Sequence, residues 1–420
     1  MTPAAFAVAL SALVAAEPTL VLENARVLAP DGGSFLTQSA IVVAGDRIDS
    51  IGAAPATGGT TRLDLANAFV IPGLIDLHTH LLLHPYDEAP WNDQVLKESL
   101  EFRTVRGVAA ARATLEAGFT TIRDLGTEGA GFADVGLRDA VRARIVPGPR
   151  ILAATKALVT TGGYGPLGYD PRWDVPRGAQ VADGADGVRR AVREQVAAGA
   201  DWIKAYADYR RAAGAAATPT FTEAELAAIV EEARSARLPV AAHATTDEGI
   251  ARAVRAGVKT IEHGYDASDA TLDLMAARGT ILCPTLAAVE ATARQAGWKP
   301  GDPEPGRLTA ARRLVARARQ RGVTVACGSD AGVFAHGANA REIELLAAAG
   351  LAPADALRSA TAIAAAAIGR EKDLGRLSPG FLADLVVLRS DPLADPNALR
   401  GVVLVVQEGR VVFDSLGASR

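Results

Sequence analysis

Three of the six histidines in this chain of 420 residues stand close together, in the stretch FVIPGLIDLHTHLLLH from Phe69 to His84. His78 and His80 end an apolar run that has the composition of a β-strand. Side chains two apart in a strand point to the same face, so these two imidazoles can bind one metal cation. The spacing therefore indicates a metal site.

Four more side chains of ligand type stand in or at the end of later apolar runs. They are Lys204 in DWIKAYA, His243 in PVAAH, His263 in KTIEHG and Asp330 in VTVACGSD. A single histidine is more often a packing residue than a ligand. Six such groups at five strand ends are better explained together, as one site for metal binding.

The elements that position these residues follow from the hydrophobic pattern. Residues 74–370 alternate short apolar runs with alanine-rich helical stretches, which is typical of parallel βα units. The strand candidates are VIPGLID, FTTIRD, RILAA, DWIKAYA, PVAAH, KTIEHG, TILCPT and VTVACGSD. They predict an α/β fold with a (β/α)8 TIM barrel, whose active sites lie at the C-terminal strand ends. The alternative is an open doubly wound sheet, but no glycine-rich phosphate fingerprint follows the first strand.

The two ends of the chain have a different pattern. Short β-branched runs separated by Gly, Asp and Pro occupy residues 17–73 and return after Gly380. We expect 17–73 and 371–420 to form one small β-sandwich domain beside the barrel. The apolar residues 1–16 indicate either a signal-peptide remnant, and so a periplasmic or secreted protein, or a docked N-terminal helix in a cytoplasmic one.

Composition narrows the classes of partner. Hydrophobic residues make up 49% and charged residues 22% of the chain, as in ordinary globular proteins. The net charge is −4, and Lys and Arg are scattered along the sequence. The sequence therefore lacks the clusters of basic residues that are typical of nucleic-acid binding. The apolar stretch at the N-terminus is too short to span a bilayer, so no membrane partner is expected. Cys283 and Cys327 stand in apolar runs and are expected to be buried free thiols.

The stretches PGLIDLHTH, WIKAYAD, AAHA, IEHG and GSDAG, in that order along nearly the whole chain, resemble the metal-dependent amidohydrolase superfamily. The chain is most similar to its imidazolonepropionase-like branch, which contains prolidase-type carboxypeptidases and ochratoxin-hydrolysing amidohydrolases. The segments HPYDEAPWNDQVLKES and TTGGYGPLGYDPRWD point to the ochratoxin group. The resemblance implies two divalent metals: His78, His80 and Asp330 hold one, His243 and His263 hold the other, and Lys204, carboxylated by CO2 to a carbamate, bridges both.

Zinc is the first expectation for so histidine-rich a ligand set, and manganese, cobalt and iron are the alternatives. Two neighbouring cations lower the pKa of a bound water and so supply hydroxide at neutral pH. By the resemblance, Asp330 is also the catalytic base that takes the proton of the nucleophile and passes it to the leaving nitrogen. The chain is therefore expected to be a binuclear amidohydrolase.

The expected reaction is hydrolysis of the amide bond of an N-acyl amino acid. Ochratoxin A, split into phenylalanine and ochratoxin alpha, is the first choice of substrate, and Xaa-Pro dipeptides are the alternative. Ring opening of a cyclic amide and deamination are alternative reactions of the same fold. The bridging Lys204 argues against deamination, because deaminases of this superfamily typically use one metal. A non-catalytic relative would have lost ligands, whereas all six positions are filled here.

Aromatic-rich loops after the first and third strands are expected to wall the substrate pocket. The candidate substrate-binding residues, each also readable as loop packing, are His84, Glu88, Trp91, Tyr164, Tyr206 and His336. Many relatives have a histidine at the position of Tyr164, so the role of that histidine does not carry over. We expect a small-molecule substrate with a free carboxylate, and the family implies a homo-oligomer, with an octamer as one candidate.

Overall fold

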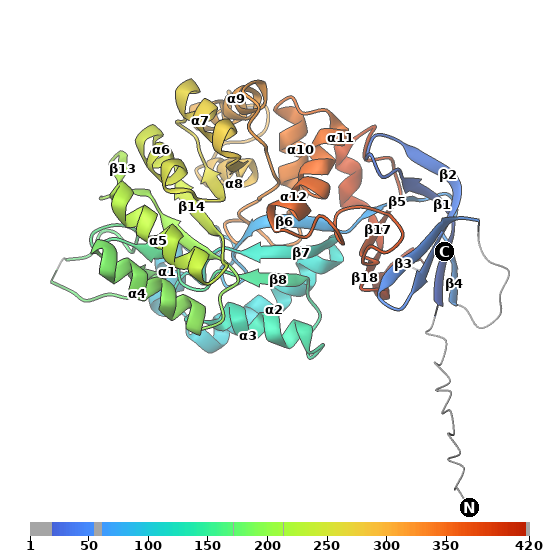
Figure 1. The fold of residues 1–420 in the computed structure, drawn as a ribbon, viewed down its shortest axis with the longest axis horizontal. Coiled ribbons are helices and arrows are strands. Elements are labelled where there is room, and N and C mark those ends of the chain that lie inside the picture. The colour runs from blue at the N-terminus through green and yellow to red at the C-terminus, as the bar shows by residue number, and fades with distance from the viewer. Residues whose placement is uncertain (1–18, 54–60, 171, 213, 417–420) are drawn as a thin grey trace, which may run out of the picture.

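The computed structural model describes residues 19–53, 61–170, 172–212 and 214–416. Figure 1 shows a central body of strands and helices with a β-sheet at one side of it. The segment 1–16, predicted as a signal-peptide remnant or helix, lies outside the described residues. Within the described ranges, no helix is both long enough and apolar enough to cross a membrane.

The sheet beside the body takes strands from both chain ends. Its strands are β1 (Thr19–Leu28), β2 (Phe35–Ala44), β3 (Arg47–Gly52), β4 (Thr61–Asp64), β5 (Phe69–Pro72), β17 (Leu385–Leu388), β18 (Val402–Gln407) and β19 (Arg410–Asp414). Their order is β19-β18-β17-β5-β1-β2-β3, and β4 pairs with β1. The pairing gives one continuous eight-stranded sheet. Its division into the two layers of a sandwich, and the domain boundaries, stay predictions.

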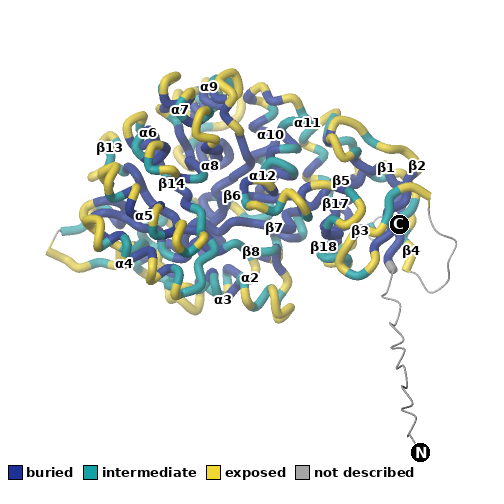
Figure 2. Tube along the Cα trace, in the orientation of Figure 1, coloured by how far each residue is buried: buried dark blue, intermediate teal, exposed yellow. Residues whose placement is uncertain are grey.

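Parallel strands form the centre of the body. A three-stranded sheet has the order β6 (Leu74–Thr79), β7 (Phe119–Asp124) and β8 (Arg150–Ala153). A six-stranded sheet has the order β10 (Gln180–Val181), β9 (Leu158–Val159), β11 (Ile203–Tyr206), β14 (Val240–Ala244), β15 (Thr260–His263) and β16 (Ile281–Cys283). Every residue of β6 and β7 is buried, as Figure 2 shows in dark blue. Such burial is expected of parallel strands that are covered on both faces.

The predicted eighth strand, VTVACGSD, is not a regular strand in the structure. Residues 324–331 instead run between β6 and β16 and bond to both. The backbone N–H of Leu77 donates to the carbonyl of Cys327 at 3.0 Å, and that of Ala326 donates to the carbonyl of Leu282 at 2.9 Å. At the other margin of these sheets, the N–H of residue 201 donates to the carbonyl of residue 153 at 2.7 Å. Hydrogen bonds therefore link both edges of the three-stranded sheet, β6 and β8, to the six-stranded sheet, at β6 through residues 324–331 and at β8 through residue 201 just before β11.

The predicted first barrel strand, VIPGLID, is divided between two sheets. β5 ends at Pro72 in the terminal sheet and β6 begins at Leu74 in the central body, so its prediction as one strand is wrong. The N–H of Gly73 donates to the carbonyl of Asp384 at 2.8 Å. A β-carbon at Gly73 would lie 2.1 Å from Oγ1 of Thr120, so only glycine fits at this junction.

Helices surround the parallel strands (Figure 1). They are α1 (Trp91–Lys97), α2 (Leu100–Glu116), α3 (Ala133–Arg142), α4 (Gly184–Ala197), α5 (Glu223–Ser235), α6 (Asp247–Ala256), α7 (Asp269–Arg278), α8 (Leu286–Gln295), α9 (Gly306–Gln320), α10 (Arg341–Ala348), α11 (Pro353–Ser359), α12 (Ala362–Ala367) and the 3-10 helix η1 (Pro396–Arg400). A short antiparallel pair, β12 (Asp208–Arg210) and β13 (Ala217–Pro219), follows β11. Thr222 and Glu225 form a capping box that begins α5.

One hydrophobic core joins the terminal sheet to the body. It includes Val386 of β17, Ile122 of β7 and Leu226 of α5, all nearly inaccessible to solvent. The thiols of Cys283 and Cys327 are free and buried, as predicted. The terminal sheet and the body therefore pack as a continuous unit beneath the strand ends that carry the site.

Candidate active site

A cavity of about 540 Å³ opens where the parallel strands end. Its lining includes five of the six predicted metal ligands: His78, His80, His243, His263 and Asp330. The sixth, Lys204 in β11, is buried, with 1% of its surface exposed, and its charge interacts with Glu262 and Asp330. Residues separated by up to about 250 positions in the sequence thus meet at one site, as the strand-end argument predicts.

His78, His80 and Asp330 form the tightest group. Their ligand atoms all lie within 4.8 Å of one another. Oδ1 of Asp330 is 3.6 Å from Nε2 of His78 and 3.3 Å from Nε2 of His80. Two imidazoles and one carboxylate are a donor set that suits zinc and other first-row divalent cations. These residues therefore fit the metal that the sequence implies.

Hydrogen bonds orient both imidazoles of this group. Nδ1 of His80 lies 2.9 Å from the carbonyl of Gly126, which can only accept, so Nδ1 carries the hydrogen. Nδ1 of His78 lies 2.9 Å from Oε2 of Glu262. Burial opposes ionisation of Glu262, but the charge of Arg123, the hydrogen bond and charge of His78 and the charge of Lys204 together outweigh burial and lower the pKa of Glu262 to about 2. Both histidines consequently direct Nε2 toward Asp330, which is the orientation that metal-binding histidines have.

His243 and His263 form the second group, with ring centroids 4.5 Å apart. Nδ1 of His263 is hydrogen-bonded to Oγ1 of Thr285 at 2.8 Å. Burial lowers the pKa of both histidines well below the usual value, so both are neutral at pH 7 and able to bind a metal. Burial also lowers the pKa of Lys204, which increases the fraction of free amine, the form that reacts with CO2.

Three residues of the site have left-handed backbone conformations. The φ angles are 75° at His263, 63° at Asp330 and 50° at Glu128. Non-glycine residues with positive φ are uncommon and cluster at functional sites, because such strain persists only where the surroundings impose it. The strand ends therefore hold these side chains in place at a conformational cost.

Buried charges behind the site were not identified as functional from the sequence. Arg123 donates to Oε1 of Glu262 at 2.9 Å, and both side chains are fully buried. Asp76 accepts the N–H groups of His78 at 3.0 Å and Ser329 at 2.9 Å, which ties β6 to residues 324–331. Charged residues inside the apolar runs GLIDLH, FTTIRD and TIEHG were the available signal, because buried charges are rare unless paired.

We expect Glu262→Gln to weaken metal binding about 10- to 100-fold, because the variant loses the carboxylate that orients His78. It should also lower the free energy of unfolding by about 3 kcal/mol, since the guanidinium of Arg123 stays buried without its ionic partner. Competition with a chromophoric chelator and thermal unfolding measure the two effects. Glu248→Gln, on the surface of α6, is the control, and unchanged metal affinity would contradict the orienting role.

Three of the six residues that were predicted to bind the substrate line the cavity. Trp91, Tyr164 and Tyr206 line it, whereas His84, Glu88 and His336 do not. Nε2 of His84 is 2.8 Å from Oε1 of Glu98, and Glu88 pairs with Arg106. Nε2 of His336 donates to the carbonyl of Leu83 at 3.2 Å. His84 and Glu88 thus pair with Glu98 and Arg106, and His336 bonds to the loop after β6. Their role in substrate binding stays a prediction.

Several residues that line the cavity were missed in the sequence. They are Glu128, Tyr209, Arg210, Tyr265 and Arg307. Arg307 stands in the first turn of α9, and no motif marks it. Tyr209 and Arg210 follow Lys204 in KAYADYR, and the aromatic spacing of that stretch was the available signal.

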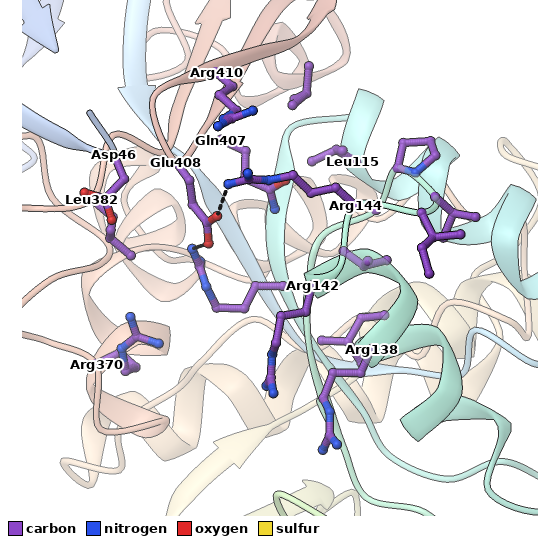
Figure 3. Close-up of a pocket in the computed structure, with 18 of the residues that line it drawn as sticks. Asp46, Leu115, Arg138, Arg142, Arg144, Arg370, Leu382, Gln407, Glu408 and Arg410 are labelled. Atoms are coloured by element: carbon purple, nitrogen blue, oxygen red, sulfur yellow. Dashed lines mark hydrogen bonds and ion pairs between the residues drawn. The ribbon is translucent and has the colours of Figure 1, made fainter. Parts of the chain in front are cut away.

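A larger cavity, of about 730 Å³, lies between α3, β8 and the terminal sheet (Figure 3). Arginines dominate its lining, and two of them face one carboxylate: Arg150 lies 2.8 Å and Arg144 3.9 Å from Glu408. Among the described residues that line it there is no histidine. The candidate metal ligands therefore make the smaller cavity the candidate active site.

A parallel α/β body with imidazoles and a carboxylate gathered at its strand ends is the arrangement of a metal-dependent enzyme. The model of the amidohydrolase family matches residues 69–412. The chain therefore belongs to the amidohydrolase family.

Similar proteins within this family have several activities. Ochratoxinase of Aspergillus niger is 29% identical over 419 residues, which cover 90% of this chain and 83% of that protein. Its crystal structure superposes with a TM-score of 0.80 at 26% identity over 95% of this chain and 96% of that one. The structure of a Xaa-Pro dipeptidase with bound methionine has a TM-score of 0.83 at 31% identity, and covers 94% of this chain and 100% of that one. Imidazolonepropionase of Symbiobacterium thermophilum is 29% identical over 91% of this chain and 90% of that protein.

Proposed function

We propose that this chain hydrolyses the amide bond between an acyl group and an amino acid that has a free carboxylate. The observation that carries the proposal is the convergence of His78, His80 and Asp330, with Nε2 of both imidazoles facing one carboxylate oxygen. Such a group beside a cavity of substrate size is what metal-assisted hydrolysis requires.

We also infer that the two parallel sheets and residues 324–331 close into a (β/α)8 barrel. The hydrogen bonds at both margins of the sheets support closure. The position of His78, His243 and His263 at the C-terminal ends of β6, β14 and β15 supports it as well, because barrel enzymes place their active sites there.

His78, His80 and Asp330 would hold one divalent cation, and His243 and His263 a second. Lys204, as a carbamate, would bridge them, and zinc is the first choice for these donors. Metal ions bound at this place would supply Lewis acidity and lower the pKa of water. Asp330 then accepts the proton of the attacking water and donates it to the leaving nitrogen.

Two arginines supply positive charge for the carboxylate of the substrate. The guanidinium of Arg307 lies 5.2 Å from the ring centre of Tyr265, and that of Arg210 lies 5.6 Å from the ring centre of Tyr209. Both arginines line the cavity. A planar guanidinium matches a carboxylate in shape and charge, so these residues are suited to bind the C-terminal end of an N-acyl amino acid.

Two substrates fit this site. The amide of ochratoxin A joins an aromatic acid to phenylalanine, and the similarity to ochratoxinase of Aspergillus niger supports this choice. Xaa-Pro dipeptides are the second candidate, supported by the similarity to a Xaa-Pro dipeptidase structure. In the cavity, Tyr164 and Tyr206 stack with centroids 4.2 Å apart and offer an apolar wall to either acyl group.

Chelation should abolish the reaction. We expect zinc-loaded protein to release the amino acid from at least one of ochratoxin A, N-acyl-phenylalanine and Xaa-Pro dipeptides. Removal of the metal should lower the rate by about 1,000-fold or more, and added zinc should restore it, because the metal supplies the activated water. Amino acid analysis measures the product, and metal content per chain distinguishes one-metal from two-metal chemistry. No release from any of these substrates would refute the proposed function.

A further inference from the structure

We propose that Glu128 binds a protonated amine on the acyl part of the substrate. The site would then be selective for dipeptides with a free N-terminus over neutral N-acyl amino acids. This inference rests on the proposed amide hydrolysis and specifies its substrate class. It also reverses the order of the two candidates above, since the acyl part of ochratoxin A has no amine.

The carboxylate of Glu128 is buried, and among the residues that the structure describes only one of its two oxygens accepts a hydrogen bond. The residue lines the cavity with 2% of its surface exposed. Oε2 accepts hydrogen bonds from the hydroxyl of Tyr164 and from Nε1 of Trp91, the latter at 2.9 Å. Within the described part of the chain, Oε1 has no hydrogen-bond partner. A buried carboxylate oxygen without a partner is costly, so a ligand that donates to Oε1 would be stabilised.

Nearby donors are already used elsewhere. Nδ1 of His80 lies 3.9 Å from Oε1 of Glu128, but its hydrogen is donated to the carbonyl of Gly126. Arg103 is buried next to this loop, and Nη1 donates to the backbone carbonyl of Glu128 at 2.7 Å. Its Nε and Nη2 donate to the carbonyls of Leu82 and Thr127. The hydrogens of these groups are therefore donated to the loop backbone, and within the described residues none of them is donated to Oε1 of Glu128.

Aromatic rings complete a cation-binding environment around this carboxylate. The ring centroid of Tyr164 lies 4.9 Å from that of Trp91, 4.2 Å from that of Tyr206 and 4.9 Å from that of Tyr209. All four rings line the cavity. Aromatic faces attract ammonium groups, and a carboxylate beside them adds an ionic hydrogen bond. The carboxylate of Glu128 and these four rings therefore favour binding of an alkylammonium group over an uncharged acyl chain.

The two charged ends of a dipeptide would then meet opposite charges in the cavity. Glu128 lies beside His80, whereas Arg307 packs on Tyr265, whose ring centroid is 5.6 Å from that of His263. The amine end would thus lie near the first group of ligands and the carboxylate end near the second. The amide bond between them would lie over the site.

The backbone at Glu128 supports a functional role. Its φ of 50° is left-handed, and Gly126 and Gly129 on either side also have positive φ, 140° and 93°. Strain of this kind persists where the surrounding structure imposes it, commonly at ligand-binding positions. A residue with only a packing role does not need a charged side chain in such a conformation.

A matched pair of substrates tests the proposal. Ala-Phe and N-propionyl-Phe differ only in the amine, and both have the same amide bond and carboxylate. We expect zinc-loaded wild-type protein to have a kcat/KM about 100-fold higher for Ala-Phe, because a site built around a polar group rejects an analogue that lacks it. Glu128→Gln should lower kcat/KM for Ala-Phe about 100-fold and change that for N-propionyl-Phe less than about threefold, because the amide keeps the size of the side chain but loses its charge.

Controls separate this inference from the proposed function. Glu231→Gln, exposed on α5, is the matched control, and metal content and thermal unfolding show that each variant is intact. Equal kcat/KM for the two substrates in the wild type, or equal losses for both in Glu128→Gln, would overturn the proposal. Hydrolysis of neither would count against the proposed function, and calorimetry of Ala-Phe and N-propionyl-Phe binding would then decide the role of Glu128. Equal Kd values would overturn it, and tighter binding of Ala-Phe that disappears in Glu128→Gln would support it.

Discussion

Asp330→Asn is expected to fold normally and to lose about 1,000-fold or more in kcat on any substrate that the wild type hydrolyses. General base catalysis contributes about 10²- to 10⁴-fold, and an amide cannot accept the proton of the attacking water. The substitution also replaces an anionic metal ligand with a neutral one, which weakens metal binding. The loss of the general base and the weaker metal binding both lower the rate of hydrolysis.

The fold should survive this change because the backbone of Asp330 does not depend on its carboxylate. Its N–H donates to the carbonyl of His78 at 2.7 Å, and this bond remains in the variant. Asparagine is among the residues that tolerate the left-handed conformation, here with φ of 63°. Steady-state kinetics at saturating zinc, with metal analysis and thermal unfolding, separates lost chemistry from lost metal. Asp139→Asn on the surface of α3 is the control, and near wild-type kcat in a metal-replete Asp330→Asn would contradict the catalytic role.

The ligand groups were predictable because each is encoded locally. His78 and His80 share a face by strand periodicity, and His243 and His263 stand at the ends of short apolar runs that the structure contains as β14 and β15. In a parallel arrangement, strand ends meet at one edge regardless of their separation in sequence. Local pattern therefore predicted which residues meet, although it gave no distances.

The rest of the site depends on contacts that no local pattern encodes. Glu128 faces the cavity because a strained loop turns it inward, and Arg307 arrives from the first turn of α9. His336 was expected at the substrate, but carbonyl groups of the loop after β6 bind its ring. The division of VIPGLID at Gly73 likewise arises from a close approach of Thr120, which only the packed structure reveals.

Lys204→Ala is expected to lower kcat by about 1,000-fold or more and to reduce the metal content of each chain. The side chain is 1% exposed in β11, and the carbamate that we propose on it would place two anionic oxygens between the metals. An alanine at this position supplies neither charge nor ligand. Mass analysis of intact, mildly handled wild-type protein should show the added mass of one CO2, which should be missing in the variant.

Chemical rescue distinguishes a carbamate from a free amine at Lys204. Truncation to alanine leaves a buried space in which acetate can replace the carbamate as an anionic ligand, so acetate with added zinc should restore part of the lost kcat. An alkylammonium ion of similar size should not, because an ammonium has no lone pair for a metal. Lys97→Ala, at an exposed position of α1, controls for the loss of a positive charge and should respond to neither additive. Rescue of Lys204→Ala by the alkylammonium ion alone would mean that the amine itself is the functional group, and the bridging carbamate would then be wrong.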